Sequence, residues 1–181
     1  MTIDAVEILL VEDDRDDVKL VLHSLKKFNI SDRIRVMGDG AEALDFIFCT
    51  GAYATRKMAD SPKVVLLDIK LPKVDGLEVL RRIRADPRTA GQPVVLLTSS
   101  REPRDVAEGY RLHANSYIVK PVDFERFTEV MRELGMYWLM LNVSPEWNGA
   151  DWGPGAGSAR PRAAVDAAAG PGARGPAPTS R

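Results

Sequence analysis

The stretch "VVLLDIKLPKVDG", Val64–Gly76, places a carboxylate at the end of an unbroken apolar run. The four residues Val64–Leu67 are all aliphatic, which is typical of a strand buried on both faces of a parallel sheet. Asp68 follows them directly. A charged group at the mouth of a buried strand is costly to remove from water, which makes Asp68 a candidate functional residue.

Short apolar runs alternate with segments of helical period along the first 135 residues. The runs predict five strands, at residues 7–12, 32–38, 63–68, 93–99 and 116–120. The other segments predict five helices, at residues 14–28, 40–51, 75–86, 103–114 and 123–135. This alternation indicates an α/β fold, in which helices cover both faces of a parallel sheet. Asp75, with Glu78 at capping-box spacing, is expected to cap a helix rather than bind a ligand.

Composition and charge are those of an ordinary globular protein. Apolar residues make up 45% and charged residues 28% of the chain. The net charge of −1 provides no field that attracts nucleic acid or an anionic membrane, and no apolar run approaches the ~18 residues of a membrane span. The single cysteine, Cys49, excludes an internal disulfide, and the N-terminus lacks the pattern of a signal peptide. A cytoplasmic setting is therefore expected.

The chain divides into three predicted segments. Residues 1–135 form the α/β domain. Residues 136–148 open with the apolar run "MYWLML", which has no later segment to cover it and is therefore expected to form an interface. In residues 149–181, 22 of 33 residues are Ala, Gly or Pro, which predicts a disordered tail because so little apolar surface cannot offset the entropy of ordering.

Polar residues lie at the carboxyl ends of four predicted strands. The first strand ends in Glu12 and Asp13, the third in Asp68, the fourth in Thr98 and the fifth in Lys120. Ligands of parallel sheets bind beyond these carboxyl ends. Converging carboxylates repel, so either one of them is protonated or a cation neutralises them. Mg²⁺ fits best, because Ca²⁺ prefers a fuller oxygen cage and Zn²⁺ prefers His or Cys. Carboxylates, a divalent ion, a lysine and a hydroxyl are what a phosphoryl group needs.

Four motifs in this order carry a family resemblance. They are "ILLVEDD", "LLDIKLPKVDG", "PVVLLTSS" and "YIVKP". Over roughly Val6 to Gly135 the sequence resembles the receiver domain of bacterial two-component response regulators. The resemblance implies a flavodoxin-like, doubly wound sheet of five parallel strands in the order 2-1-3-4-5, flanked by five helices. It also implies a signalling protein that catalyses only its own phosphorylation and dephosphorylation.

The resemblance assigns roles around one metal ion. Asp68 is expected to be the nucleophile that takes a phosphoryl group from a histidine kinase. Asp13 and Asp68 are expected to bind Mg²⁺ directly, together with the backbone carbonyl of Lys70, and Glu12 through a coordinated water. Lys70 and Ser100, each two residues after a site residue, are expected to tune the lifetime of the phosphoryl group.

The resemblance also implies how phosphorylation is sensed. Lys120 is expected to pair with Asp68 and then with the phosphoryl oxygens, and Thr98 to donate a hydrogen bond to the phosphoryl group. Tyr117 is expected to swing inward with Thr98. The Lys120–Pro121 peptide bond is expected to be cis. Output is expected by protein–protein contact, because the chain shows no DNA-binding segment.

A narrower likeness points to partners. "LHANSYIVKP" and "YWLMLN" are similar to the small response regulators that pair with bacterial and cyanobacterial phytochromes. This implies a phytochrome-type histidine kinase as partner. It also implies a homodimer through the face made by helix four, strand five and helix five, together with residues 136–142. Neither nucleic acid nor membrane is expected as a partner.

Two other functions are compatible with this fold. One is a receiver that acts by docking alone, without phosphorylation, although all the residues needed for phosphorylation are present. The other is a magnesium-dependent phosphatase of the haloacid-dehalogenase type. That class needs a second Asp two positions after the nucleophile, where this chain has Lys70.

Overall fold

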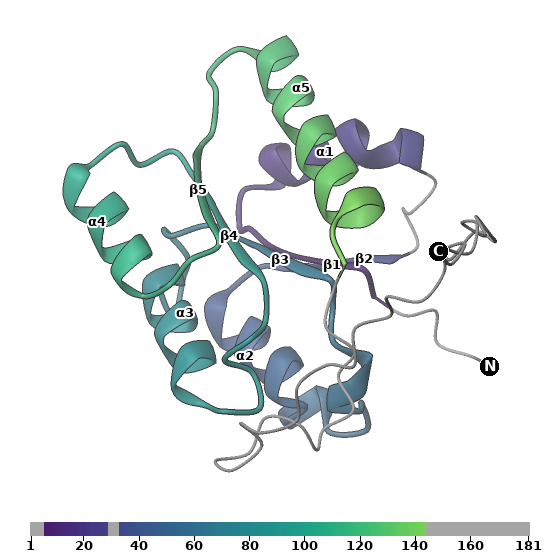
Figure 1. The fold of residues 1–181 in the computed structure, drawn as a ribbon, viewed down its shortest axis with the longest axis vertical. Coiled ribbons are helices and arrows are strands. Elements are labelled where there is room, and N and C mark those ends of the chain that lie inside the picture. Colours follow the sequence, from purple (N-terminus) through teal and green to yellow (C-terminus); the bar gives the residue numbers. More distant parts are fainter. Residues whose placement is uncertain (1–5, 29–32, 144–181) are drawn as a thin grey trace, which may run out of the picture.

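A computed structural model describes residues 6–28 and 33–143 of the chain (Figure 1). Its centre is one sheet of five parallel strands in the order β2-β1-β3-β4-β5, which confirms the doubly wound topology. The strands are β1 (Ile8–Val11), β2 (Ile34–Met37), β3 (Val64–Leu67), β4 (Val94–Thr98) and β5 (Ser116–Val119). Each is one to three residues shorter than the sequence predicts, because the flanking residues leave the ladder to enter loops.

Five helices cover the sheet. They are α1 (Arg15–Leu25), α2 (Gly40–Phe48), α3 (Gly76–Ala85), α4 (Pro103–Arg111) and α5 (Phe124–Gly135). α1 and α5 cover one face, and α2, α3 and α4 cover the other (Figure 1). Three helices start one residue later than predicted, because Asp14, Asp75 and Asp123 are N-caps whose carboxylates accept hydrogen bonds from backbone N–H groups of the first turn.

Two apolar layers hold the helices to the sheet. Alternate residues of the central strands point to opposite faces. Leu9, Val11, Val65 and Leu67 pack under α2 and α3, whereas Ile8, Leu10, Val64 and Leu66 pack under α1 and α5. β1 and β3 are buried along their whole length, whereas all four residues of the edge strand β5 are only half-buried. The central strands are therefore fully covered by the helices, whereas β5 is partly exposed to solvent.

The chain after α5 continues as one π-helical segment, η5 (Met136–Leu141). The expectation that this apolar run is uncovered is wrong at Trp138, which is 8% exposed and packs with the α1 and α5 core. Met136, Tyr137, Met140 and Leu141 remain exposed. Residues 144–148 and the predicted tail, 149–181, lie outside the described residues.

No helix in the described ranges has the length and apolar character that crossing a membrane requires.

Candidate functional site

The predicted site residues meet at the carboxyl edge of the sheet. Glu12 and Asp13 follow β1, Asp68 follows β3, Thr98 ends β4, and Lys120 follows β5. β1 and β3 are neighbours, and the backbone N–H of Asp68 donates to the carbonyl of Val11 at 3.0 Å. Parallel strands present all their carboxyl ends at one edge, which is why residues so distant in sequence converge here.

Three carboxylates form a compact oxygen cluster. One oxygen each from Glu12, Asp13 and Asp68 lie within 4.8 Å of one another. Glu12 is 2% exposed and Asp68 6%, whereas Asp13 is open to solvent. An all-oxygen donor set that is open on one side fits a hard divalent ion that keeps some of its waters.

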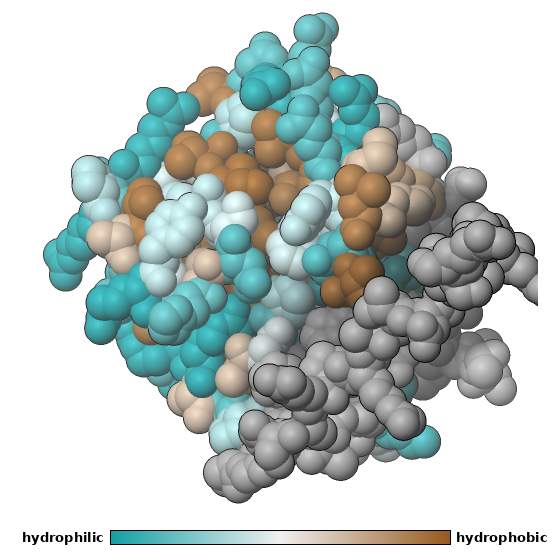
Figure 2. All heavy atoms as spheres, viewed as in Figure 1, coloured by the Kyte–Doolittle hydropathy of each residue, from teal (hydrophilic) through white to brown (hydrophobic). Residues whose placement is uncertain are grey.

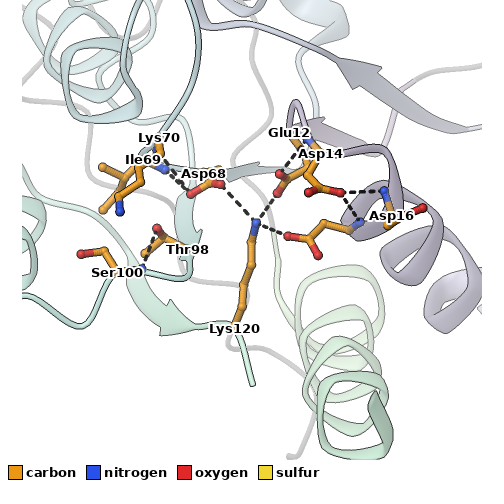
Figure 3. A network of polar contacts seen from close by, with 10 residues as sticks. Glu12, Asp14, Asp16, Asp68, Ile69, Lys70, Thr98, Ser100 and Lys120 are labelled. Atoms are coloured by element: carbon orange, nitrogen blue, oxygen red, sulfur yellow. Dashed lines mark hydrogen bonds and ion pairs between the residues drawn. The ribbon is translucent and has the colours of Figure 1, made fainter. Parts of the chain in front are cut away.

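The Lys120 side chain reaches between Glu12 and Asp68 of this cluster (Figure 3). Its Nζ lies 2.5 Å from Glu12 Oε2, 2.7 Å from Asp17 Oδ2 and 3.1 Å from Asp68 Oδ2. The side chain of Lys120 is only 8% exposed. An ammonium group carries three N–H donors, and here each has a carboxylate acceptor.

Asp17 was not among the predicted site residues. Asp16 and Asp17 both occupy the first turn of α1, where acidic residues are favourable to the helix dipole whether or not they contact anything else. The one sequence signal for Asp17 is its position four residues after Asp13, about one helical turn beyond the strand end.

Burial and charge act in opposite directions on the ionisable groups. Burial raises the pKa of Glu12 to about 7, although the hydrogen bond from Lys120 opposes the shift. Burial alone lowers the pKa of Lys120, but the carboxylates of Asp17, Glu12 and Asp68 outweigh it, and the net pKa is raised. The surrounding carboxylates thus favour the charged form of Lys120, whereas burial works against the charged form of Glu12.

The Asp68 carboxylate is held in a defined orientation (Figure 3). Its Oδ1 accepts hydrogen bonds from the backbone N–H groups of Ile69, at 2.6 Å, and Lys70, at 3.4 Å. Its Oδ2 faces Lys120. The side chain of Lys70 is exposed. Donors on both oxygens therefore fix the direction in which the Asp68 carboxylate points.

The hydroxyl residues connect the site to α4. Thr98 is fully buried, and its Oγ1 accepts a hydrogen bond from the backbone N–H of Ser100 at 3.2 Å. The Ser100 hydroxyl donates to Asp105 Oδ2 in the first turn of α4, at 2.6 Å. The Tyr117 hydroxyl donates to the Ser100 carbonyl at 3.2 Å. The loop between β4 and α4 is thus tied both to the site and to β5.

One geometric expectation is wrong. The Lys120–Pro121 peptide bond is trans, as are the other peptide bonds of the described residues. A bond before proline favours trans by about 0.5–1 kcal/mol, so trans is the ordinary form unless surrounding contacts select cis.

Comparison with protein families matches residues 8–132 of the chain to the response regulator receiver domain. Among curated proteins, the chain is 39% identical to a probable methanogenesis regulatory protein, FilR2, of Methanothrix harundinacea (strain 6Ac), over 76% of this chain and 86% of that protein. It is 36% identical to the response regulator Rcp1 of Synechocystis sp. (strain ATCC 27184 / PCC 6803 / Kazusa), over 76% of this chain and 92% of that protein.

Two solved structures resemble the fold closely. The phosphorylated cyanobacterial phytochrome response regulator RcpA has a TM-score of 0.72 at 33% identity, covering 77% of this chain and 97% of that one. The Mn²⁺-bound form of Rcp1 has a TM-score of 0.71 at 36% identity, covering 76% of this chain and 97% of that one.

Proposed function

This chain belongs to the response regulator receiver domain family, and we propose that it accepts a phosphoryl group on Asp68 from a histidine kinase and signals by protein–protein contact. Receiver domains bind a divalent metal, and we propose Mg²⁺ here. The observation that carries the proposal is the convergence of three carboxylates with the buried Lys120.

In the proposed reaction an Asp68 oxygen attacks the phosphorus of a phosphohistidine. A P–O bond forms at Asp68, the P–N bond breaks with its electron pair going to the leaving imidazole nitrogen, and that nitrogen takes a proton from solvent. Asp13, Asp68 and the Lys70 carbonyl would hold Mg²⁺ directly, and Glu12 would hold it through water. The bound ion would neutralise charge on the phosphoryl oxygens.

The remaining residues respond to the new group. Lys120 would exchange its contact with Asp68 Oδ2 for a phosphoryl oxygen. Thr98 would turn its hydroxyl toward the phosphoryl group, and Tyr117 would follow it inward. The contacts that link Ser100 with Tyr117 and with Asp105 of α4 are the route by which such a change would reach the surface.

The test is covalent modification by a small phosphodonor. Protein incubated with acetyl phosphate and Mg²⁺ should gain the mass of one phosphoryl group, and Asp68→Asn should abolish the gain. Asp75→Asn is the matched control: it changes an exposed carboxylate at the other end of the same loop, and asparagine still caps α3. A wild-type protein that never gains the mass, or an Asp68→Asn protein that still does, would refute the proposal.

We propose a phytochrome-type histidine kinase as the partner. The support is the likeness to RcpA and Rcp1, one of which is described as a phytochrome response regulator. The similarity to FilR2 points to a different pathway, so phosphotransfer decides between them. A phytochrome kinase should label this chain within seconds and an unrelated kinase only slowly. Equal phosphotransfer rates from the two kinases would refute the phytochrome-type kinase as the partner.

We also propose a homodimer through α4, β5, α5 and residues 136–142. Apolar side chains gather on the face that carries β5 and the end of α5 (Figure 2). The exposed apolar residues that support this are Tyr110, Val122, Phe124, Met136, Tyr137, Met140 and Leu141. Leu141→Glu should shift the mass measured by light scattering toward the monomer. A strictly monomeric wild type at high concentration, with and without beryllofluoride, would exclude the dimer.

A further inference from the structure

Asp17 contacts the proposed site but has no part in the reaction described above. Its Oδ2 lies 2.7 Å from Lys120 Nζ, and its side chain is 33% exposed. Its neighbour Asp16 is 85% exposed and pairs instead with Lys19, at 2.8 Å. Two adjacent acids of the same helical turn therefore have different surroundings, and only Asp17 reaches the site.

Local structure explains this reach. The Asp14 carboxylate accepts hydrogen bonds from the backbone N–H groups of Asp16, at 2.8 Å, and Asp17, at 3.2 Å, which holds the first turn of α1. Side chains on a helix lean toward its N-terminus. Asp17 therefore leans back toward the carboxyl edge of the sheet, where Lys120 arrives from β5.

The three acceptors around Lys120 constrain its direction. The lysine side chain is a flexible four-carbon stem, and its ammonium carries three N–H groups at fixed angles. Glu12 takes one N–H and Asp17 another, so the third is directed at Asp68 Oδ2. With one acceptor removed, the ammonium gains freedom to turn away from Asp68 or to pair more closely with Glu12.

We propose that Asp17 is a positioning residue. It holds Lys120 so that one N–H faces the Asp68 carboxylate and, after transfer, the phosphoryl oxygen that takes that contact. This inference rests on the proposed phosphorylation of Asp68. Asp17 acts through Lys120 and does not itself touch the phosphoryl group.

The experiment compares Asp17→Ala, Asp17→Asn and Asp16→Ala by mass spectrometry, as initial rates of phosphorylation by acetyl phosphate at saturating Mg²⁺. Loss of a charge-assisted hydrogen bond at a partly exposed site predicts a roughly three- to ten-fold slower rate for Asp17→Ala. Asp17→Asn keeps an acceptor oxygen and should recover part of the rate. Asp16→Ala removes the same first-turn charge without touching Lys120, and should match the wild type.

A second readout is independent of phosphorylation. Mn²⁺ binding, followed by electron paramagnetic resonance, should weaken in both Asp17 variants because each loses a negative charge near the cluster. Thermal melts by circular dichroism show whether each variant is folded. If the wild type is phosphorylated but folded Asp17→Ala keeps its full rate, or Asp16→Ala slows equally, the positioning role is overturned while the proposed function stands. A wild type that is not phosphorylated overturns the proposed function itself.

Discussion

Gly76 is the position where a single methyl group should disturb the site most. It is the first residue of α3, it is buried, and its N–H donates to the Ile69 carbonyl at 2.8 Å. A Cβ added to Gly76 would lie 2.0 Å from the backbone oxygen of Asp68 and 2.9 Å from Ile69 Cα. Both neighbours are main-chain atoms, so no side chain can rotate to relieve the overlap.

The structure sets the size of the effect. A Cβ essentially never approaches within 3.0 Å of another atom, so Gly76→Ala must displace the Asp68 main chain by about 1 Å. Overpacking of this kind costs about 1–3 kcal/mol of unfolding free energy. A displacement of about 1 Å at a reacting group lowers a rate by about 100-fold. The loop also carries the Lys70 carbonyl, so Mg²⁺ binding should weaken too.

The assay measures the initial rate of phosphorylation by acetyl phosphate at saturating Mg²⁺, together with urea unfolding. Gly38→Ala is the matched control, because a Cβ there would have no atom within 4 Å. Gly38→Ala should leave the rate unchanged. A folded Gly76→Ala protein with the wild-type rate, or a Gly38→Ala protein slowed to the same degree, would refute the steric reasoning.

Three further predictions concern stability, each measured by urea unfolding. Arg84→Ala should cost about 2–3 kcal/mol, because its half-buried guanidinium donates to the carbonyls of Ala90, Gln92 and His113 and joins α3 to the loops before β4 and β5. Trp138→Ala should cost about 3–5 kcal/mol, since it empties a place in the α1 and α5 core. Asp39→Asn should cost under about 1 kcal/mol at pH 7, through loss of the pair with exposed Lys73. The Lys73 hydrogen bond lowers the pKa of Asp39, so its stabilisation is present above the ordinary Asp pKa and is lost as pH falls below it.

Two of these substitutions have a control variant, and the third is checked by its pH dependence. Arg82→Ala removes an exposed arginine that pairs with Glu78 across one helical turn, and should cost less than about 1 kcal/mol. Leu141→Ala trims a side chain that is 67% exposed and should be nearly neutral. Equal losses of unfolding free energy from Arg84→Ala and Arg82→Ala would contradict the idea that Arg84 joins α3 to the two loops. If Trp138→Ala kept the unfolding free energy of the wild type, Trp138 would not contribute to the core as proposed. A cost of Asp39→Asn that persists unchanged at pH 2 would rule out the ion pair as its cause.

The sequence alone was sufficient to predict the helices and strands and the group of polar residues that meet at the carboxyl edge of the sheet. The period of apolar residues is a local property, so it predicted all ten strands and helices with small errors at their ends. Glu12, Asp13, Asp68, Thr98 and Lys120 were found because each follows or ends a strand. A parallel sheet places such residues at one edge without further information.

Only the tertiary structure revealed the features that depend on contacts between segments distant in sequence. Asp16 and Asp17 are chemically alike in sequence, and only the position of Lys120, 103 residues beyond Asp17, separates them. Trp138 was expected to be uncovered with its neighbours, yet it is buried because it packs with apolar residues of α1 and α5 that lie far from it in sequence or on the preceding helix. Arg84 had no sequence signal, because its partners are main-chain carbonyls that every residue type carries. Local periodicity reports how one segment folds, whereas these features depend on where a second segment lies in space.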